Sequence, residues 1–199
     1  MKIRVRDDSV EIEGYVNAIE RLSKPLNSRI GKFTERIKKG AFKRAIERND
    51  NVHILLNHNW DKDLGSTKQG NLKLNEDSIG LRAKAVINDR EVIEKARNGD
   101  LVGWSFGFTD RDVDTHSEDG MTTRDVKDLD LYEVSILDRT RTPAYEGTMV
   151  SVRSDENIYH GSLLETEIEI RDDSTPEEKH KDIDYSKAEN LIKEMKGEN

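Results

Sequence analysis

The sequence predicts a mainly β protein of the α+β class, with short helices and a charged C-terminal tail. Apolar and polar residues alternate over several short segments separated by turn residues, which is the pattern of strands. Helical spacing of apolar residues is limited to two short segments before the tail. Hydrophobic residues make up 33% of the 199 residues and charged residues 37%. The apolar residues must therefore be concentrated in one part of the chain, which can form a core.

The predicted strands all lie in the first 153 residues. In the first of them Val10, Ile12 and Val16 share one face, whereas the second is short and nearly continuously apolar. A polar turn separates the third from the fourth, and we interpret this pair as a hairpin. The strands are predicted over residues 10–16, 52–56, 71–74, 81–86, 104–108 and 129–137. We interpret the acidic segment 110–119 as an exposed loop or hairpin tip.

Two short helices are predicted between these strands. The first runs from about Gly40 to Arg48, with an apolar stripe formed by Ala41, Phe42, Ala45 and Ile46. The second begins after Asn88, the expected N-cap, with Glu91 at its third position, and Asn98-Gly99 ends it.

Residues 1–153 and 154–199 differ in composition. Aromatic residues nearly vanish after Ser154, while Glu, Asp and Lys dominate. Such a segment does not bury enough apolar surface to form its own core. We therefore expect one domain over 1–153, followed by an acidic tail over 154–199 that is partly helical or disordered. In the tail, residues 165–171 are compatible with a strand or a helix, and helical signals begin at Ser174 and Tyr185.

Composition also excludes several classes of protein. The net charge of −8 is unfavourable for duplex DNA, whose recognition relies on a basic surface. The absence of cysteine excludes disulfides, a thiol nucleophile and Cys-ligated zinc. No apolar stretch approaches the ~20 residues that span a bilayer, and the N-terminus lacks the apolar run of a signal peptide. We expect a soluble cytoplasmic protein that needs no cofactor and binds neither nucleic acid nor membrane.

Ser105 is the first candidate for chemistry. On the strand 104–108, Trp104, Phe106 and Phe108 share one face and suit a core, while Ser105 and Gly107 share the other. A hydroxyl beside a bare glycine leaves room for the close approach of a ligand or another backbone, as a nucleophile needs. A buried or edge serine bonded to its neighbours is the more common interpretation of such a segment.

His58 and Glu133 are the second and third candidates. His58 continues the parity of Val52, Ile54 and Leu56, which places it at the mouth of a buried strand, where an imidazole suits a general base. A strand-end histidine satisfied by the backbone is the ordinary alternative.

Glu133 shares a face with Leu131, Ser135 and Leu137, and its burial is costly unless it is paired. A histidine partner would both satisfy the carboxylate and be oriented by it, as in a catalytic triad. A solvated face or a salt bridge to an arginine explains the same pattern. Ser135 is a rival nucleophile whose place beside the carboxylate favours a supporting role.

A metal site is a weaker interpretation. His53 and His58 are five residues apart and therefore diverge, although Asp61 and Asp63 would add oxygen ligands. No zinc-protease spacing is present.

Taken in order, these segments resemble the prohead maturation proteases of tailed bacteriophages, serine proteases distantly similar in fold to the herpesvirus assembly protease. The resemblance covers about three quarters of the chain, with Lys39 standing where the family has proline. The segments that carry it are Gly14-Tyr15-Val16, residues 33–42, Leu56-Asn57-His58, Leu64-Gly65-Ser66, Gly80-Leu81, Ser105-Phe106-Gly107-Phe108, residues 131–135 and Pro143-Ala144-Tyr145.

The resemblance implies a serine endopeptidase with Ser105 as nucleophile, His58 as base and Glu133 as the acidic third member. It implies a small antiparallel β-barrel of the herpesvirus-protease type surrounded by short helices, and oxyanion-binding amides near Asp138 to Arg141. The implied partners are the scaffolding segment of the major capsid protein and the protease itself, by self-cleavage and as a homodimer or higher oligomer. The implied location is the assembling procapsid in the host bacterial cytoplasm. The alternative is a non-catalytic assembly or scaffolding protein that uses the β domain as a binding module.

Overall fold

The computed structural model describes residues 1–28, 31–118, 120–140, 151–153, 156–164 and 168–174 of the chain. Strands dominate this part, and its helices are α1 (Ala41–Arg48) and α2 (Arg90–Arg97). Neither helix is long and apolar enough to cross a membrane. The predicted mainly β architecture is confirmed.

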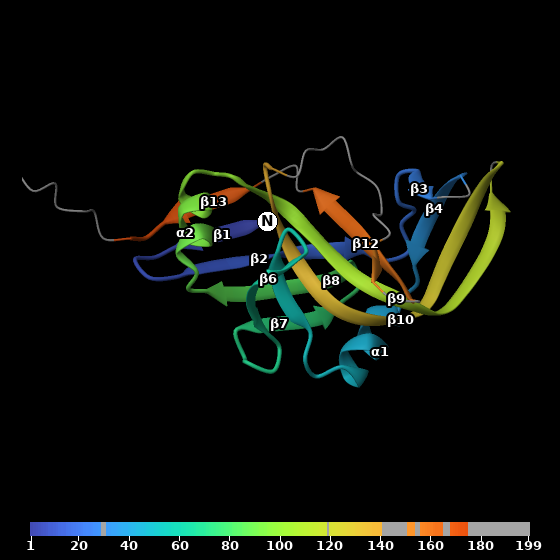
Figure 1. Ribbon diagram of the computed structural model, residues 1–199, viewed down its shortest axis with the longest axis horizontal. Coiled ribbons are helices and arrows are strands. Elements are labelled where there is room, and N and C mark those ends of the chain that lie inside the picture. The colour runs from blue at the N-terminus through green and yellow to red at the C-terminus, as the bar shows by residue number, and fades with distance from the viewer. Residues whose placement is uncertain (29–30, 119, 141–150, 154–155, 165–167, 175–199) are drawn as a thin grey trace, which may run out of the picture.

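One sheet has five strands, in the order β13-β1-β2-β8-β7 (Figure 1). Its strands alternate in burial as sequence periodicity predicts: in β8, Leu81 and Ala83 are buried while Arg82 and Lys84 face solvent. The strands are β1 (Lys2–Val5), β2 (Val10–Ala18), β7 (Leu72–Glu76), β8 (Gly80–Ile87) and β13 (Glu169–Asp172).

The second sheet is built on the long antiparallel pair β9 (Leu101–Glu118) and β10 (Met121–Asp138). Its path runs β11-β12-β9-β10-β4-β3, and β5 also pairs with β10 while β6 pairs with β5. Both β4 and β5 run parallel to β10. The bounds are β3 (Leu26–Ser28), β4 (Gly31–Ile37), β5 (His53–Leu56), β6 (Asn59–Ser66), β11 (Ser151–Arg153) and β12 (Glu156–Leu164).

The core lies where β9 and β10 cross the first sheet (Figure 1). As predicted, Trp104, Phe106 and Phe108 are buried on one face of β9. The Phe106 ring stacks on Phe108 and meets the edge of Phe42 from α1, with centroid distances of 5.2 Å in both pairs. The opposite face of β9 is left outside this core, and it carries Ser105 and Gly107.

Both helices cover the core with short apolar stripes. Ala41, Phe42 and Ala45 of α1 are buried, as predicted. The N-cap of α2 is Asp89 and not Asn88, because the Asp89 carboxylate accepts the Val92 N–H at 3.0 Å.

The described strands form two sheets with free edges, and no closed barrel is found. The segment 110–118 is the exposed outer end of a hairpin, one of the two predicted alternatives, and not a loop, because it continues β9 and pairs with β10 up to Glu118. Within the segment predicted as a tail, β12 pairs with β9 and β13 with β1, so residues 169–171 are a strand. The helices expected beyond Ser174 and the turn at Pro143-Ala144-Tyr145 lie outside the described residues.

Candidate functional site

The side chains of Ser105, His58 and Glu133 meet on the face of β9 and β10 that is turned away from the core. His58 Nε2 lies 2.7 Å from Ser105 Oγ, and His58 Nδ1 lies 2.7 Å from Glu133 Oε1. One imidazole therefore joins a hydroxyl to a carboxylate through its two nitrogens. The structure brings together the three residues that the sequence selected.

Adjacent strands position the serine and the glutamate. Ser105 on β9 is directly opposite Ser135 on β10, and Gly107 is opposite Glu133. Because paired residues point to the same side of a sheet, these four positions share one face. Ser105 has no exposed surface.

His58 comes from the tight turn between β5 and β6. Asn57 and His58 have φ values of 55° and 59°, and Leu56 pairs with Asn59 across the turn. Positive φ at both central residues is the requirement of a type I′ hairpin turn. The predicted strand parity of His58 is therefore wrong, although its place at the end of the strand is right.

Backbone hydrogen bonds hold this turn against β10. The Asn57 N–H donates to the Ile136 carbonyl at 2.9 Å, and the His58 N–H donates to Ser135 Oγ at 3.0 Å. Left-handed backbone at residues other than glycine is unfavourable and is found where surrounding contacts enforce it. These contacts hold the backbone of the turn, while the His58 ring is oriented by Glu133 and Ser105.

Glu133 is buried at 2% exposure, and each carboxylate oxygen has a partner. Oε1 faces His58, and Oε2 accepts the Ser135 hydroxyl at 2.6 Å. A Cβ on Gly107 would lie 2.4 Å from Glu133 Oε1. The close approach predicted at Gly107 is therefore made by this carboxylate, and the contacts of Ser135 agree with its predicted supporting role.

A second polar network borders the site, and sequence patterns did not reveal it. Asn57 Oδ1 accepts the Asp138 N–H at 3.1 Å, and Lys95 on α2 pairs with Asp138 Oδ2 at 2.9 Å. Burial acts to raise the pKa of Asp138, but hydrogen bonds from Thr140, Lys95 and Asn57 outweigh it and lower this pKa to about 2. Of the network's members only Asn57 has a signal in the sequence, because an asparagine at the end of a strand is typical of a turn.

The backbone amides expected to bind an oxyanion are engaged elsewhere. The N–H of Asp138 donates to Asn57, that of Arg139 to the Asp100 carbonyl, and that of Thr140 to Asp138 Oδ1. The expectation therefore does not hold for these three amides in this structure. Arg141 lies outside the described residues.

The residues of the metal interpretation do not gather. His53 Nδ1 pairs with Asp63 at 2.8 Å and its Nε2 with Asn51 at 3.1 Å, whereas His58 faces Ser105 and Glu133. Within the ranges that the structure describes, no cluster of three or more His, Asp or Glu side chains fits a metal ion.

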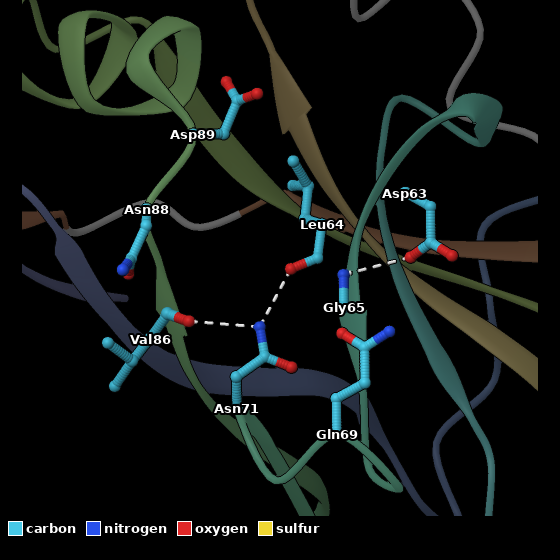
Figure 2. A pocket seen from close by; sticks show the side chains of 8 residues that line it. All are labelled: Asp63, Leu64, Gly65, Gln69, Asn71, Val86, Asn88 and Asp89. Atoms are coloured by element: carbon cyan, nitrogen blue, oxygen red, sulfur yellow. Dashed lines mark hydrogen bonds between the residues drawn. The ribbon is translucent and has the colours of Figure 1, made fainter.

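A polar pocket lies between β6 and the start of α2 (Figure 2). Asn71 crosses it, and its Nδ2 donates to the carbonyls of Leu64 at 2.8 Å and Val86 at 3.2 Å. The rim carboxylates of Asp63 and Asp89 accept backbone N–H groups of Gly65 and Val92. The pocket contains none of the three candidate residues, and its polar groups join the two sheets.

The arrangement is that of an activated hydroxyl. A neutral imidazole that accepts the Ser105 proton at Nε2 donates its Nδ1 hydrogen to Glu133, which stabilises the charged ring formed by the transfer. The residues can therefore support nucleophilic attack by Ser105 on a carbonyl carbon.

A family model described as caudovirus prohead serine protease matches residues 1–160. No curated protein and no solved structure matched the chain.

Proposed function

Since the chain belongs to the caudovirus prohead serine protease family, we propose that it is an endopeptidase with Ser105, His58 and Glu133 as its catalytic triad. The observation that carries this assignment is the pair of 2.7 Å contacts that join His58 to Ser105 and to Glu133. Family membership alone indicates a serine peptidase. The geometry supports these three residues as the ones responsible.

The mechanism follows from the hydrogen bonds. Ser105 Oγ attacks the scissile carbonyl carbon while His58 Nε2 takes its proton. Collapse of the tetrahedral intermediate breaks the C–N bond, and His58 returns the proton to the leaving amine. Water then attacks the acyl-enzyme by the same route and releases Ser105. Glu133 keeps the imidazole in the tautomer that has Nδ1 protonated, and Ser135 keeps the carboxylate turned toward the ring.

The proposed substrates are the scaffolding segment of the major capsid protein, separate or fused, and the protease itself. The proposed place of action is the assembling procapsid in the bacterial host. We further propose that the charged segment after residue 153 targets the enzyme to the shell or acts as scaffold, and that self-cleavage trims it. Its high charge and few apolar residues support this role.

Intact-mass measurement over time tests the proposal. Wild-type chain, Ser105→Ala and the control Ser66→Ala are expressed alone and with a capsid protein. Ser66 suits the control because it is also a buried serine, on β6 and away from His58. We expect fragments from wild type and Ser66→Ala and none from Ser105→Ala. Equal cleavage in all three samples would overturn the assignment of Ser105.

The non-catalytic alternative predicts no alignment of these side chains. A binding module gains nothing from an imidazole held between a serine and a buried glutamate. Their convergence therefore favours the hydrolytic proposal over a scaffolding role for the β domain.

A further inference from the structure

β9 carries Ser105 between two neighbouring strands. β10 occupies one edge of β9, and β12 pairs with the other edge in antiparallel fashion. The register sets Leu164 opposite Gly103 and Tyr159 opposite Phe108, with Ser162 directly opposite Ser105. β12 is thus the strand next to Ser105 on the edge of β9 opposite β10.

Access to Ser105 is closed in this arrangement. Its exposed fraction is 0%, whereas the His58 side chain beside it keeps 16%. Attack requires a carbonyl carbon within about 3–3.5 Å of Oγ. An external peptide therefore reaches Ser105 only after a neighbouring segment has moved.

The β9 edge has the geometry of a peptide-binding site. Residues facing each other in an antiparallel pair have Cα atoms about 4.5–5.5 Å apart, so carbonyl groups of a strand paired here come within reach of a serine side chain. Extended peptides bind by adding a strand to such an edge through main-chain hydrogen bonds.

We propose that the β9 edge from Gly103 to Phe108 binds the substrate as an extended antiparallel strand, and that β12 occupies this site in the structure. The form described is then latent, and β12 must leave before substrate binds. This inference rests on the proposed role of Ser105 as nucleophile. The recognised ligand is polypeptide backbone in extended conformation.

β12 is paired along its two edges less completely than a central strand such as β10. Its second edge pairs with β11 only from Glu156 to Ile158. Among the described strands, residues 159–164 thus have a main-chain partner on the β9 side alone. A strand held along one edge opens at lower cost than a central strand such as β10.

The first test measures how fast Ser105 reacts with a small fluorophosphonate. In this reaction the serine oxygen forms a P–O bond, the P–F bond breaks, fluoride leaves and His58 takes the proton. Gly161→Pro introduces a residue without N–H into β12 and should disrupt its pairing. Ile170→Pro is the matched control, because it changes β13, which pairs with β1 far along the fold from Ser105.

We expect Gly161→Pro to be labelled at least about tenfold faster than wild type, as when strand opening limits access, and Ile170→Pro to match wild type. Equal rates in wild type and Gly161→Pro would overturn the inference, as would equal acceleration by both prolines. Absence of Ser105-dependent labelling in every sample would instead overturn the proposed function.

A disulfide lock covers the case in which the proline variant fails to fold. The chain has no cysteine, so Gly103→Cys with Leu164→Cys creates a single thiol pair at facing positions, within disulfide range. We expect the oxidised variant to lose peptidase activity and labelling, and reduction to restore both. Full activity in the oxidised, locked protein would overturn the inference.

Discussion

Gly107 provides the space that the Glu133 carboxylate occupies. The carboxylate lies over the bare Cα of the opposite strand, where it reaches both His58 and Ser135. Any side chain at position 107 would compete with it for this space. The smallest residue in the site therefore determines where its charge lies.

Replacement of Gly107 by alanine should lower activity strongly and stability only modestly. The new Cβ would lie 2.4 Å from Glu133 Oε1, so the carboxylate must move and the His58 ring loses its orienting partner. We expect kcat/KM to fall by about 100-fold or more, as when a base loses its orienter, with a loss of unfolding free energy of about 1–3 kcal/mol. Kinetics and urea unfolding measure the two effects.

Gly70→Ala is the control for this substitution. Gly70 has a φ of 82°, and a Cβ added there would meet no atom within 4 Å, so the change strains the backbone without crowding a neighbour. It should lower stability and leave kcat/KM unchanged. Unchanged kcat/KM in Gly107→Ala would contradict the role of Glu133.

Single-residue patterns made Ser105 and Glu133 candidates, but only the resemblance joined them into a triad. Ser105 faces away from the aromatic residues of its strand, and Glu133 lies on a partly apolar face where a carboxylate needs a partner. His58 was selected for its place at a strand end, but its parity was misleading because the chain turns at Asn57. Lys95 and Asp138 were not predictable, since only tertiary packing brings α2 to the end of β10.

At the scale of elements, α2 anchors the end of β10 and, through it, the β5–β6 turn. Lys95 binds Asp138, and the Asp138 N–H in turn binds Asn57. The helix thus acts on His58 only indirectly, through Asp138 and Asn57.

The Lys95–Asp138 pair should make this anchoring depend on pH. The folded-state pKa of Asp138 is about 2, below its ordinary 3.8, so its stabilising contribution is present above about pH 4 and is lost as pH falls toward 2. We expect Lys95→Met to lower the unfolding free energy by about 1–3 kcal/mol at neutral pH, because a buried carboxylate loses its partner. The difference from wild type should shrink below about pH 3.

Chemical denaturation over a pH series checks this, with Lys62→Met as the control. Lys62 on β6 pairs with Glu91 on α2, but both side chains are 44% exposed. Exposed pairs contribute little, so this variant should have the same unfolding free energy as wild type at every pH. A Lys95→Met deficit that persists unchanged at pH 2 would exclude the ion pair as its cause.

Element prediction succeeded where alternation was clear and failed where charge replaced it. The strands around 10–16, 81–86 and 104–108 were found because apolar residues repeat every second position. The outer halves of β9 and β10 were missed because charged pairs, and not apolar residues, join the strands there. Examples are Arg111–Asp130 at 3.0 Å between β9 and β10, and Arg36–Asp125 at 2.7 Å between β4 and β10.

At the scale of the whole molecule, one core is shared by two sheets whose strands come from distant parts of the sequence. Periodicity predicted the β class but not how the two sheets share one core. Pairing between β10 and β4 or β5 depends on contacts between residues far apart in sequence. The division at residue 153 stays a prediction.

Glu35 should give global stability a second dependence on pH. Burial raises the folded-state pKa of Glu35 to about 7, against the opposing effect of Arg124, whose Nη1 lies 3.0 Å from Glu35 Oε2. A raised carboxyl pKa means that the folded state binds the proton more tightly. The contribution of Glu35 to stability is therefore highest below the ordinary value of 4.5 and falls as pH rises toward 7.

We expect wild type to lose on the order of 1–3 kcal/mol across this interval relative to Glu35→Gln, which has no proton to release. Unfolding free energies measured every half pH unit would show the difference. Glu94→Gln, at an exposed position on α2, is the matched control and should follow wild type. Parallel curves for wild type and Glu35→Gln would refute a titration of Glu35 in this range.

The central position of β10 also has a consequence for synthesis. Residues 133–136 of β10, which include Glu133, pair both with β9, which carries Ser105, and with β5, which leads into the turn that carries His58. Chain growth from the N-terminus therefore cannot yield a competent site until β10 has left the ribosome. β12 emerges later still, so a nascent chain passes through an interval in which the site is assembled and the β9 edge is still open.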